Sequence, residues 1–309
     1  MKKKIAIVLL LLLTLCGCTK RFTIEGTDGD KKTTKSYVSN IICKPEEDDN
    51  VKIYVENKDK LVSDYDKLPA CKDLKITSGG YEGLWTSFFV KPLAWIIVKL
   101  GLLVKNYGLS IMIIGIVVRA LMMPLTKKSN NMNNSMQKAQ KELNALEKKY
   151  AGKEANRDAM MAKSQEMLMI YKKYGINPMS SCLFAFIQLP IFFALLEAIY
   201  RVPVFFEKKF LVYNLGTTPA EGLLAHNYWY IILIVLIIGT TYLSFKNMNT
   251  TTTDEMQAKQ MKMMSTFMVV FISIISFSLP TSIALYWIVS NAFTIVQNLI
   301  LKRGKYGKI

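Results

Sequence analysis

An arginine inside an apolar run is the residue of this sequence with the clearest chemical potential. Arg119 lies in GIVVRALMMPL (115–125), which is typical of the end of a membrane-spanning helix. An arginine at the centre of such a helix costs about 2.5–3.5 kcal/mol on insertion scales. Arg119 is therefore predicted to attract an anion within the membrane. Alternatively, it snorkels to the nearer interface, about 9 Å away by helical rise.

Amides and hydroxyls lie at a comparable depth in other apolar segments. Gln188 is roughly 14 Å from the start of its segment, and Ser273 and Asn291 are roughly 15 Å from the corresponding ends of theirs. Gln297 lies closer to the end of the last segment. Glu197 would lie roughly 27 Å deep, which makes it a poor partner for the arginine. The pattern predicts a wet cavity with no carboxylate at the depth of the arginine.

Other kinds of chemistry have little support in the sequence. The single histidine, His226, is expected on the surface of a loop, and no nucleophile has a base nearby. No Cys, His and carboxylate set has metal-ligand spacing, so we expect neither an enzyme, nor a metal, nor a cofactor. The net charge of +17 accompanies apolar blocks of spanning length. This combination favours a membrane protein facing anionic lipid over a binder of specific nucleic acid.

The N-terminus is expected to be a targeting signal. Residues 1–17 have a basic start and an apolar stretch, and LCGC (15–18) resembles a lipobox in which Cys18 is lipidated after cleavage. The alternatives are an ordinary secretory signal and an uncleaved anchor. Lipidation would place the polar segment 18–82 outside the cytosol, where Cys43 and Cys71 either form a disulfide or remain two thiols. Within this segment VKIYVEN alternates like a strand, and the rest is expected to be loops.

The remainder predicts an all-α polytopic membrane protein. Residues 83–108 combine lysines with tryptophans, which suits an amphipathic helix in the outer interface. The alternative is a first spanning helix. Five apolar segments then approach the roughly 20 residues that a bilayer requires. They are residues 109–125, 179–200, 228–245, 263–279 and 281–301.

Charge predicts the orientation of these spans. Lysine and arginine gather in the connections expected in the cytoplasm, whereas the expected outer loop 201–227 has only Arg201, Lys208 and Lys209. This asymmetry follows the positive-inside rule and leaves the C-terminus in the cytoplasm. The expected cytoplasmic segments are 126–178, 246–262 and the tail 302–309.

The segment 126–178 is predicted to be an antiparallel helical hairpin. Apolar residues from Met132 to Tyr150 step alternately by four and three, which is a heptad seam, and a weaker seam runs from Met160 to Tyr174. Ala-Gly-Lys (151–153) separates them. Methionine is abundant in the hairpin and in the second cytoplasmic loop. It serves either as ordinary packing in the seam or as an adaptable surface for diverse apolar partners.

Three motifs carry a resemblance to a known family. IQLPIFFALLEAIYR (187–201), LPTSIALYWIVSNAFTIVQN (279–298) and VVRALMMPLTKKS (117–129) resemble the YidC/OxaA membrane protein insertases, in the family's order. The likeness covers about residues 84–303, and the lipobox fits Gram-positive-type members. The segment 19–80 departs from it, because those members usually have a shorter tail there.

The resemblance implies an insertase with a hydrophilic groove open to the cytoplasm and to lipid. Arg119 would attract acidic residues of a substrate tail, and the other groove residues would be Gln188, Ser273, Trp287, Asn291 and Gln297. Nascent membrane proteins would be the partners, with the ribosome and the Sec translocon as further partners. The alternative function is a small-solute or anion transporter, against which stands the lack of paired repeats.

Overall fold

The computed structural model describes residues 19–28, 31–153, 156–176, 179–248 and 255–306. The expected signal segment and the expected lipidation site at Cys18 lie outside these residues. The described chain forms two compact units. The first contains the described chain up to Gly115, together with Gln188–Leu233 and Ser278–Trp287. Residues 19–82 of this unit are called the N-terminal domain. The second consists of Ile116–Ile187, Ile234–Phe277 and the chain from Ile288 onward.

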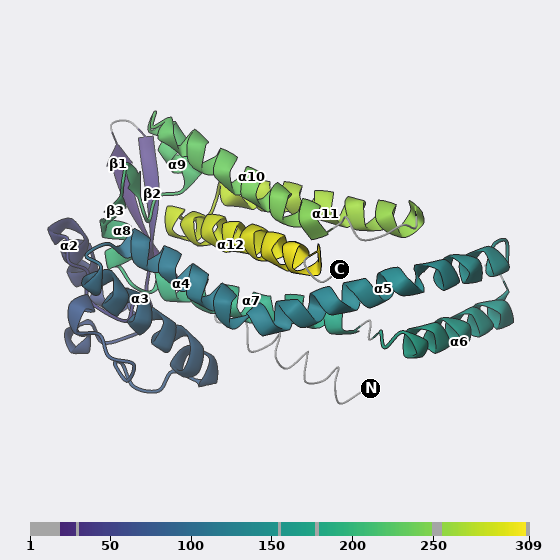
Figure 1. Cartoon of the computed structure of the whole chain (residues 1–309). Helices are drawn as coiled ribbons and strands as arrows, with labels where there is room; N and C mark the ends of the chain where they lie inside the picture. Colours follow the sequence, from purple (N-terminus) through teal and green to yellow (C-terminus); the bar gives the residue numbers. More distant parts are fainter. Residues whose placement is uncertain (1–18, 29–30, 154–155, 177–178, 249–254, 307–309) are drawn as a thin grey trace. The chain divides into compact units, whose positions relative to one another are not determined.

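The N-terminal domain is more ordered than the sequence predicts. Strands β1 (Arg21–Asp28) and β2 (Lys31–Val38) pair antiparallel, and α2 (Asp48–Glu56) follows (Figure 1). The expected strand VKIYVEN is wrong, because most of it lies in α2. Asp48 and Asp49 favour the positive end of that helix, and its Tyr54 is buried. The expected loop at 21–38 is also wrong. In its first half Phe22 and Ile24 alternate with polar residues, and Gly29-Asp30, the dipeptide between the paired Asp28 and Lys31, is a common turn signal.

A small core holds the domain together. Tyr54 is buried among residues from the strands and from the loops around them, with the side chain of Tyr200 against the cluster. The other buried members are Phe22, Val38, Ile41, Tyr65 and Leu68. The guanidinium of Arg21 lies 4.7 Å from the ring centre of Tyr200, a cation–π distance. The domain is therefore packed against the end of a later helix.

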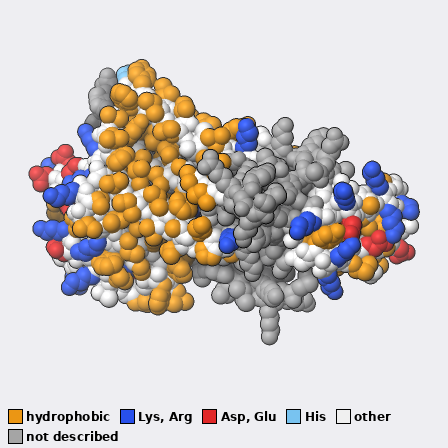
Figure 2. Space-filling model, in the orientation of Figure 1, with side chains coloured by type: hydrophobic (Ala, Val, Ile, Leu, Met, Phe, Trp, Pro, Cys, Tyr) orange, Lys and Arg blue, Asp and Glu red, His pale blue; other side chains and the backbone are white. Residues whose placement is uncertain are grey.

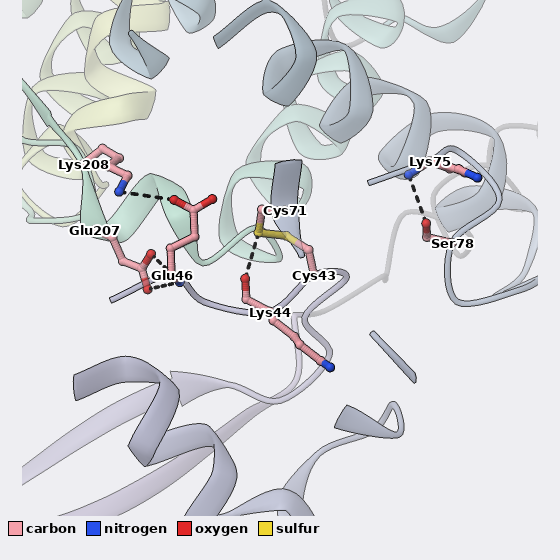
Figure 3. Close-up of a disulfide and its surroundings, with 8 residues drawn as sticks. All are labelled: Cys43, Lys44, Glu46, Cys71, Lys75, Ser78, Glu207 and Lys208. Carbon is pink, nitrogen blue, oxygen red and sulfur yellow. Dashed lines mark hydrogen bonds and ion pairs between the residues drawn. A yellow bond between two sulfur atoms is a disulfide. The ribbon is translucent and has the colours of Figure 1, made fainter. Parts of the chain in front are cut away.

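Cys43 and Cys71 form a disulfide in this domain (Figure 3). Both side chains are fully buried, and the bridge joins residues 28 positions apart. Three short 3-10 helices, Lys58–Lys60, Tyr65–Lys67 and Cys71–Asp73, lie in or next to the loop that it closes. Such a covalent link compensates for a core too small to hold the segment alone.

Removing this disulfide is expected to lower the free energy of unfolding of the domain by about 3 kcal/mol. The measurement is thermal unfolding of the purified chain in detergent, with Cys43→Ala/Cys71→Ala compared with the wild type. Reduction should lower the midpoint of the wild type and leave that of the double variant unchanged. Equal midpoints for the oxidised wild type and the variant would show that the bridge does not stabilise the fold.

The next helix starts with a π-helical turn at Thr86–Val90 and continues as α3 (Lys91–Leu103). One face of α3 is buried, and this face includes the side chain of Lys91. The opposite side exposes Phe88, Phe89 and Leu103. Gly101 allows the ring of Tyr107, which begins α4 (Tyr107–Leu121), to approach closely, because an added Cβ would meet the ring at 2.2 Å.

In the part of the chain that the structure describes, four long helices and several short elements follow residues 123–173. α7 (Met179–Tyr200) leads to the short elements α8 (Val204–Glu207), β3 (Lys209–Phe210), β4 (Tyr213–Asn214) and α9 (Pro219–Leu224). α10 (Trp229–Met248), α11 (Glu255–Ser276) and α12 (Thr281–Tyr306) follow. Among the described residues, three stretches are long and apolar enough to cross a membrane: Thr86–Leu103, Trp229–Lys246 and Thr281–Ile300. The first belongs to the segment for which we expect an interfacial helix.

Helices α5 (Met123–Tyr150) and α6 (Arg157–Lys173) run antiparallel (Figure 1). Ala139 and Leu143 of the expected seam are buried against Ile176, with Met167 and Ile170 packed alongside. Met160 of the weaker seam is instead exposed, as are Met161, Leu168 and Met169.

A similar set of hydrogen bonds joins α5 and α6 at each end of this helical pair. Lys149 and Tyr150 at the end of α5 both donate to Glu166 of α6, at 2.6 and 2.8 Å. Lys173 and Tyr174 at the end of α6 donate to Glu142 of α5, at 2.5 and 2.8 Å. These hydrogen bonds lower the pKa of each glutamate, the lysine contributing more than the tyrosine. The same Lys-Lys-Tyr sequence ends both helices.

Candidate functional site: polar groups among apolar helices

The structure divides the expected groove residues between the two units. Arg119, Ser273 and Asn291 belong to the second unit, together with Gln297. Trp287 belongs to the first unit, as does Gln188, whose side chain lies outside the described residues. Trp287 packs edge-on against Phe192 of α7, with ring centres 5.3 Å apart.

A polar stripe runs along α12 in the second unit. Ser290, Asn291, Thr294 and Gln297 are spaced by one, three and three residues, which places them on one side of a helix. Ser290, Asn291 and Gln297 are buried, although much of the surrounding sequence is apolar enough to span a membrane. The stripe therefore brings polar groups into the interior of this unit.

The stripe contacts α10 through one amide. Asn291 Nδ2 donates to Thr241 Oγ1 at 2.9 Å, and both residues are buried. Thr241 and Ser290 are not among the groove residues expected from the sequence, although the helical spacing of Ser290 from Thr294 and Gln297 indicates it. Ser290 Oγ and Gln297 Nε2 are buried without a hydrogen-bond partner in the described part of the chain. Buried polar atoms of this kind call for water or a bound polar group.

The hydroxyl of Ser273 forms its hydrogen bond within α11. Its Oγ donates to the carbonyl of Val269 at 2.6 Å, and its own carbonyl accepts from Ser276 Oγ at 2.7 Å. A serine that bonds one turn back satisfies its hydroxyl locally. Ser273 is partly buried, and its hydroxyl donor is occupied by this bond within α11.

Arg119 lies near the end of α4 and is partly buried. It interacts with other groups of the protein, so the expectation of an arginine with no partner of its own is not retained. Its guanidinium is nevertheless the fixed positive charge of α4, in a stretch that is otherwise apolar from Leu109 to Leu121 except for Ser110.

A second polar cluster, which sequence reasoning did not predict, lies in the first unit. Arg201 is 1% exposed and pairs with Glu82 and with Glu197, the latter at 3.4 Å. Lys91 is 3% exposed and lies 2.8 Å from the other oxygen of Glu82. Trp85 Nε1 donates to Glu197 at 2.9 Å. These five residues are called the ion cluster below.

Backbone groups complete the ion cluster. Arg201 Nε donates to the carbonyl of Asn40 at 2.6 Å, and Lys91 Nζ donates to that of Gly80 at 2.6 Å. Burial alone would raise the pKa of Glu82. The hydrogen bond from Lys91 and the charge of Arg201 outweigh it, so the pKa lies below the ordinary glutamate value. The N-terminal domain is thus attached to α3 and α7 through charge.

A buried carboxylate provides a further attachment. Glu207 accepts from the backbone amide of Glu46 at 3.0 Å (Figure 3). It also accepts from Asn50 Nδ2 at 3.0 Å. This places its negative charge at the N-terminal end of α2, where the helix dipole favours it. Lys208 pairs with the side chain of Glu46 at 3.3 Å. The segment after α7 is therefore joined to the domain by main-chain and side-chain bonds.

The chemistry of both clusters is electrostatic. Across the described residues, no three His, Cys, Asp or Glu side chains gather as metal ligands. The stripe on α12 presents amides and hydroxyls, whereas the ion cluster consists of charges that satisfy one another. The first arrangement suits transient contact with a polar chain, and the second suits a fixed attachment.

Known proteins share most of this architecture. The family model of the 60Kd inner membrane protein matches residues 99–308. The membrane protein insertase YidC of Oceanobacillus iheyensis is 33% identical over 232 residues, which is 74% of this chain and 87% of the relative. The insertase MisCA of Bacillus subtilis is 32% identical over 238 residues, covering 76% of this chain and 86% of the relative.

A solved structure agrees with these relatives. An active YidC insertase with its first transmembrane domain resolved superposes with a TM-score of 0.51 at 26% identity. The match covers 73% of this chain and spans about half, 48%, of the solved chain. The family match also makes this chain a bacterial membrane protein. The chain belongs to the family of the 60Kd inner membrane protein, which is the YidC/OxaA family that its motifs resemble.

Proposed function

We propose that this chain is a membrane protein insertase that moves polar segments of nascent membrane proteins through a hydrophilic groove. The observation that carries the proposal is the polar stripe of α12, in which Ser290 and Gln297 present buried polar atoms without a hydrogen-bond partner among the described residues, within the stretch Thr281–Ile300 that is apolar enough to span. Arg119 contributes a positive charge in another apolar helix. The names of the relatives, which are membrane protein insertases, support the same activity.

The physical role of such a groove is to shorten the apolar barrier. A hydrophilic tail that enters a polar groove crosses only the remaining part of the hydrocarbon core, which is about 30 Å thick in a typical bilayer. Amides and hydroxyls replace the water that the tail loses. Arg119 attracts acidic residues of the tail. Gln188, Ser273, Trp287, Asn291 and Gln297 line or support the path.

The energy comes from partitioning. The sequence has no nucleotide-binding motif, so release is driven by the transfer of the apolar segment of the substrate into lipid and by the membrane potential. The spans are residues 109–125, 179–200, 228–245, 263–279 and 281–301. The N-terminus is outside and lipidated on Cys18, residues 83–108 lie in the outer interface, and the α5–α6 pair is in the cytoplasm. There the pair receives nascent chains, with the ribosome or Sec translocon nearby and anionic lipid alongside.

Photo-crosslinking tests this function. A photoreactive residue at position 119 or 188 is expected to form adducts with nascent membrane proteins during translation in the presence of membranes. The matched control is position 235, because Val235 is exposed on α10 in the spanning stretch. Adduct yields at 119 and 188 no higher than at 235 would contradict the groove. Coupled solute flux in proteoliposomes without substrate insertion would favour the transporter.

A further inference from the structure

A two-residue turn after α8 consists of two exposed apolar residues, one of which has an unfavourable backbone conformation. β3 and β4 pair with Phe210 opposite Tyr213, so Leu211 and Val212 form the turn. Leu211 has a φ of 54°, in the left-handed region that leucine rarely adopts. Turns of this length favour glycine or asparagine at such positions. Leu211 is nevertheless 78% exposed, so packing within the protein does not explain it.

The body of this hairpin is firmly held. Phe210 packs on Gly108 of α4, where an added Cβ would come within 2.5 Å of the ring. The Tyr213 hydroxyl donates to the carbonyl of Trp229 at 3.0 Å, and the Tyr213 ring lies edge-on to Tyr230. The strands on either side of the turn therefore pack against the first residues of α4 and α10. The side chains of Leu211 and Val212 in the turn are exposed.

More apolar side chains are exposed beside the turn. Leu224 ends α9 with 81% of its surface exposed, and Tyr228 and Trp229 are exposed where α10 begins. Leu211, Val212, Leu224, Tyr228 and Trp229 are called the apolar rim. Tyr230, next to Trp229, packs on Gly222 of α9, which connects the members of the rim.

The apolar rim continues into a membrane-facing surface. Directly after Trp229, α10 exposes Ile231, Ile232 and Val235 in a stretch long and apolar enough to span. Figure 2 shows hydrophobic side chains spread over this part of the molecule, whereas charged side chains gather at its left edge. Tyrosine and tryptophan at the end of a span are typical of the boundary between headgroups and acyl chains.

We propose that the apolar rim inserts into the bilayer interface at the Trp229 end of α10 and anchors the 201–227 loop there. The occupant is lipid, because the rim is continuous with the exposed side of α10 and has interfacial aromatic residues. Leu211 keeps its strained conformation because an apolar side chain at that position gains burial in lipid, which asparagine would not. The proposal rests on the membrane location of the chain and not on insertase activity.

Photo-crosslinking to lipid tests the rim directly. The full chain with p-benzoylphenylalanine at position 211 or 224 is reconstituted in vesicles of radiolabelled phosphatidylethanolamine and phosphatidylglycerol. Lipid adducts several-fold above those from position 55 are expected, and position 235 is the positive control. Val55 is the matched control because it is exposed on α2 among charged neighbours. Yields equal to those of position 55, or a product with twice the mass of the chain, would overturn the proposal.

A second variant separates anchoring from folding. Leu211→Asn suits the left-handed backbone, so its thermal midpoint in detergent is expected to equal or exceed that of the wild type. Lipid adducts from position 224 should fall in the same variant, since the turn no longer enters the interface. A lower midpoint would show that Leu211 serves packing and would overturn the proposal. These vesicles contain no substrate, so failure of the insertase function would leave the result unchanged.

Discussion

Replacing Arg201 with methionine is expected to destabilise the first unit by about 3–5 kcal/mol. Arg201 is almost fully buried between Glu82 and Glu197. Removing its charge leaves Glu197 with only the Trp85 hydrogen bond, while Glu82 retains Lys91. A carboxylate left in such a place keeps the cost of desolvation and loses the compensating attraction. The measurement is the midpoint of thermal unfolding of the purified chain in detergent.

The matched control removes the stranded charge. Arg201→Met/Glu197→Gln is expected to recover part of the lost stability, because the neutral amide needs no counter-charge and still accepts from Trp85. If the double variant were no more stable than Arg201→Met, packing of the arginine stem and its bond to Asn40 would account for the loss. The electrostatic interpretation of the ion cluster would then be wrong.

The dependence of stability on acid pH tests the ion cluster independently. The pKa of Glu82 is lowered in the folded protein, so its ionised form contributes stability above the ordinary glutamate value of 4.5. This contribution is lost as the pH falls from about that value through the folded pKa. Glu82→Gln should therefore flatten the loss of the thermal midpoint in this acid range. A variant with the same acid dependence as the wild type would contradict the lowered pKa.

Replacing Arg119 with alanine is expected to reduce insertion of substrates with acidic tails roughly tenfold, the equivalent of one charged hydrogen bond of about 1.5 kcal/mol. Arg119→Lys should retain most of the activity, because it keeps a positive charge on α4. The measurement is protease protection of a translocated tail in proteoliposomes.

Tail charge supplies the control for this prediction. A substrate whose tail has Asn and Gln in place of Asp and Glu should insert equally well with arginine or alanine at position 119. If the alanine variant inserted acidic tails normally, attraction by Arg119 would have no part in the mechanism. Equal losses for acidic and neutral tails would instead indicate that Arg119 maintains the fold.

Local periodicity was enough to predict the buried seam of α5 but not the N-terminal domain. The heptad seam from Met132 to Tyr150 includes Ala139, Leu143 and Leu146, and all three are buried. The strand predicted for residues 51–57 was wrong because so short a segment fits the period of a strand or of a helix. The burial of Tyr54 against residues distant in the sequence favours the helix. The hairpin at 21–38 was not predicted, because lysine, threonine and serine fill most of β2 and leave no alternation of apolar and polar residues there.

The polar stripe of α12 and the ion cluster also differ in how far the sequence predicts them. Asn291 and Gln297 could be found from sequence, since polar residues inside an apolar segment stand out, and Ser290 follows from helical spacing. Pairing of Glu82 with Arg201 could not be found, because 119 residues separate them and nothing local links them. The depth estimate gave Glu197 no partner. Its actual partners, Arg201 and Trp85, required the tertiary structure.

The attachments of the N-terminal domain also set an order for its synthesis. Asn40 and Glu46 bond to Arg201 and Glu207, which lie 161 residues later in the chain. Domains generally fold as they leave the ribosome, N-terminal part first. This domain lacks two of its main contacts until α7 and α8 have been made. Its final docking therefore follows the synthesis of α7 and α8, so an early part of the chain is among the last to be fixed in place.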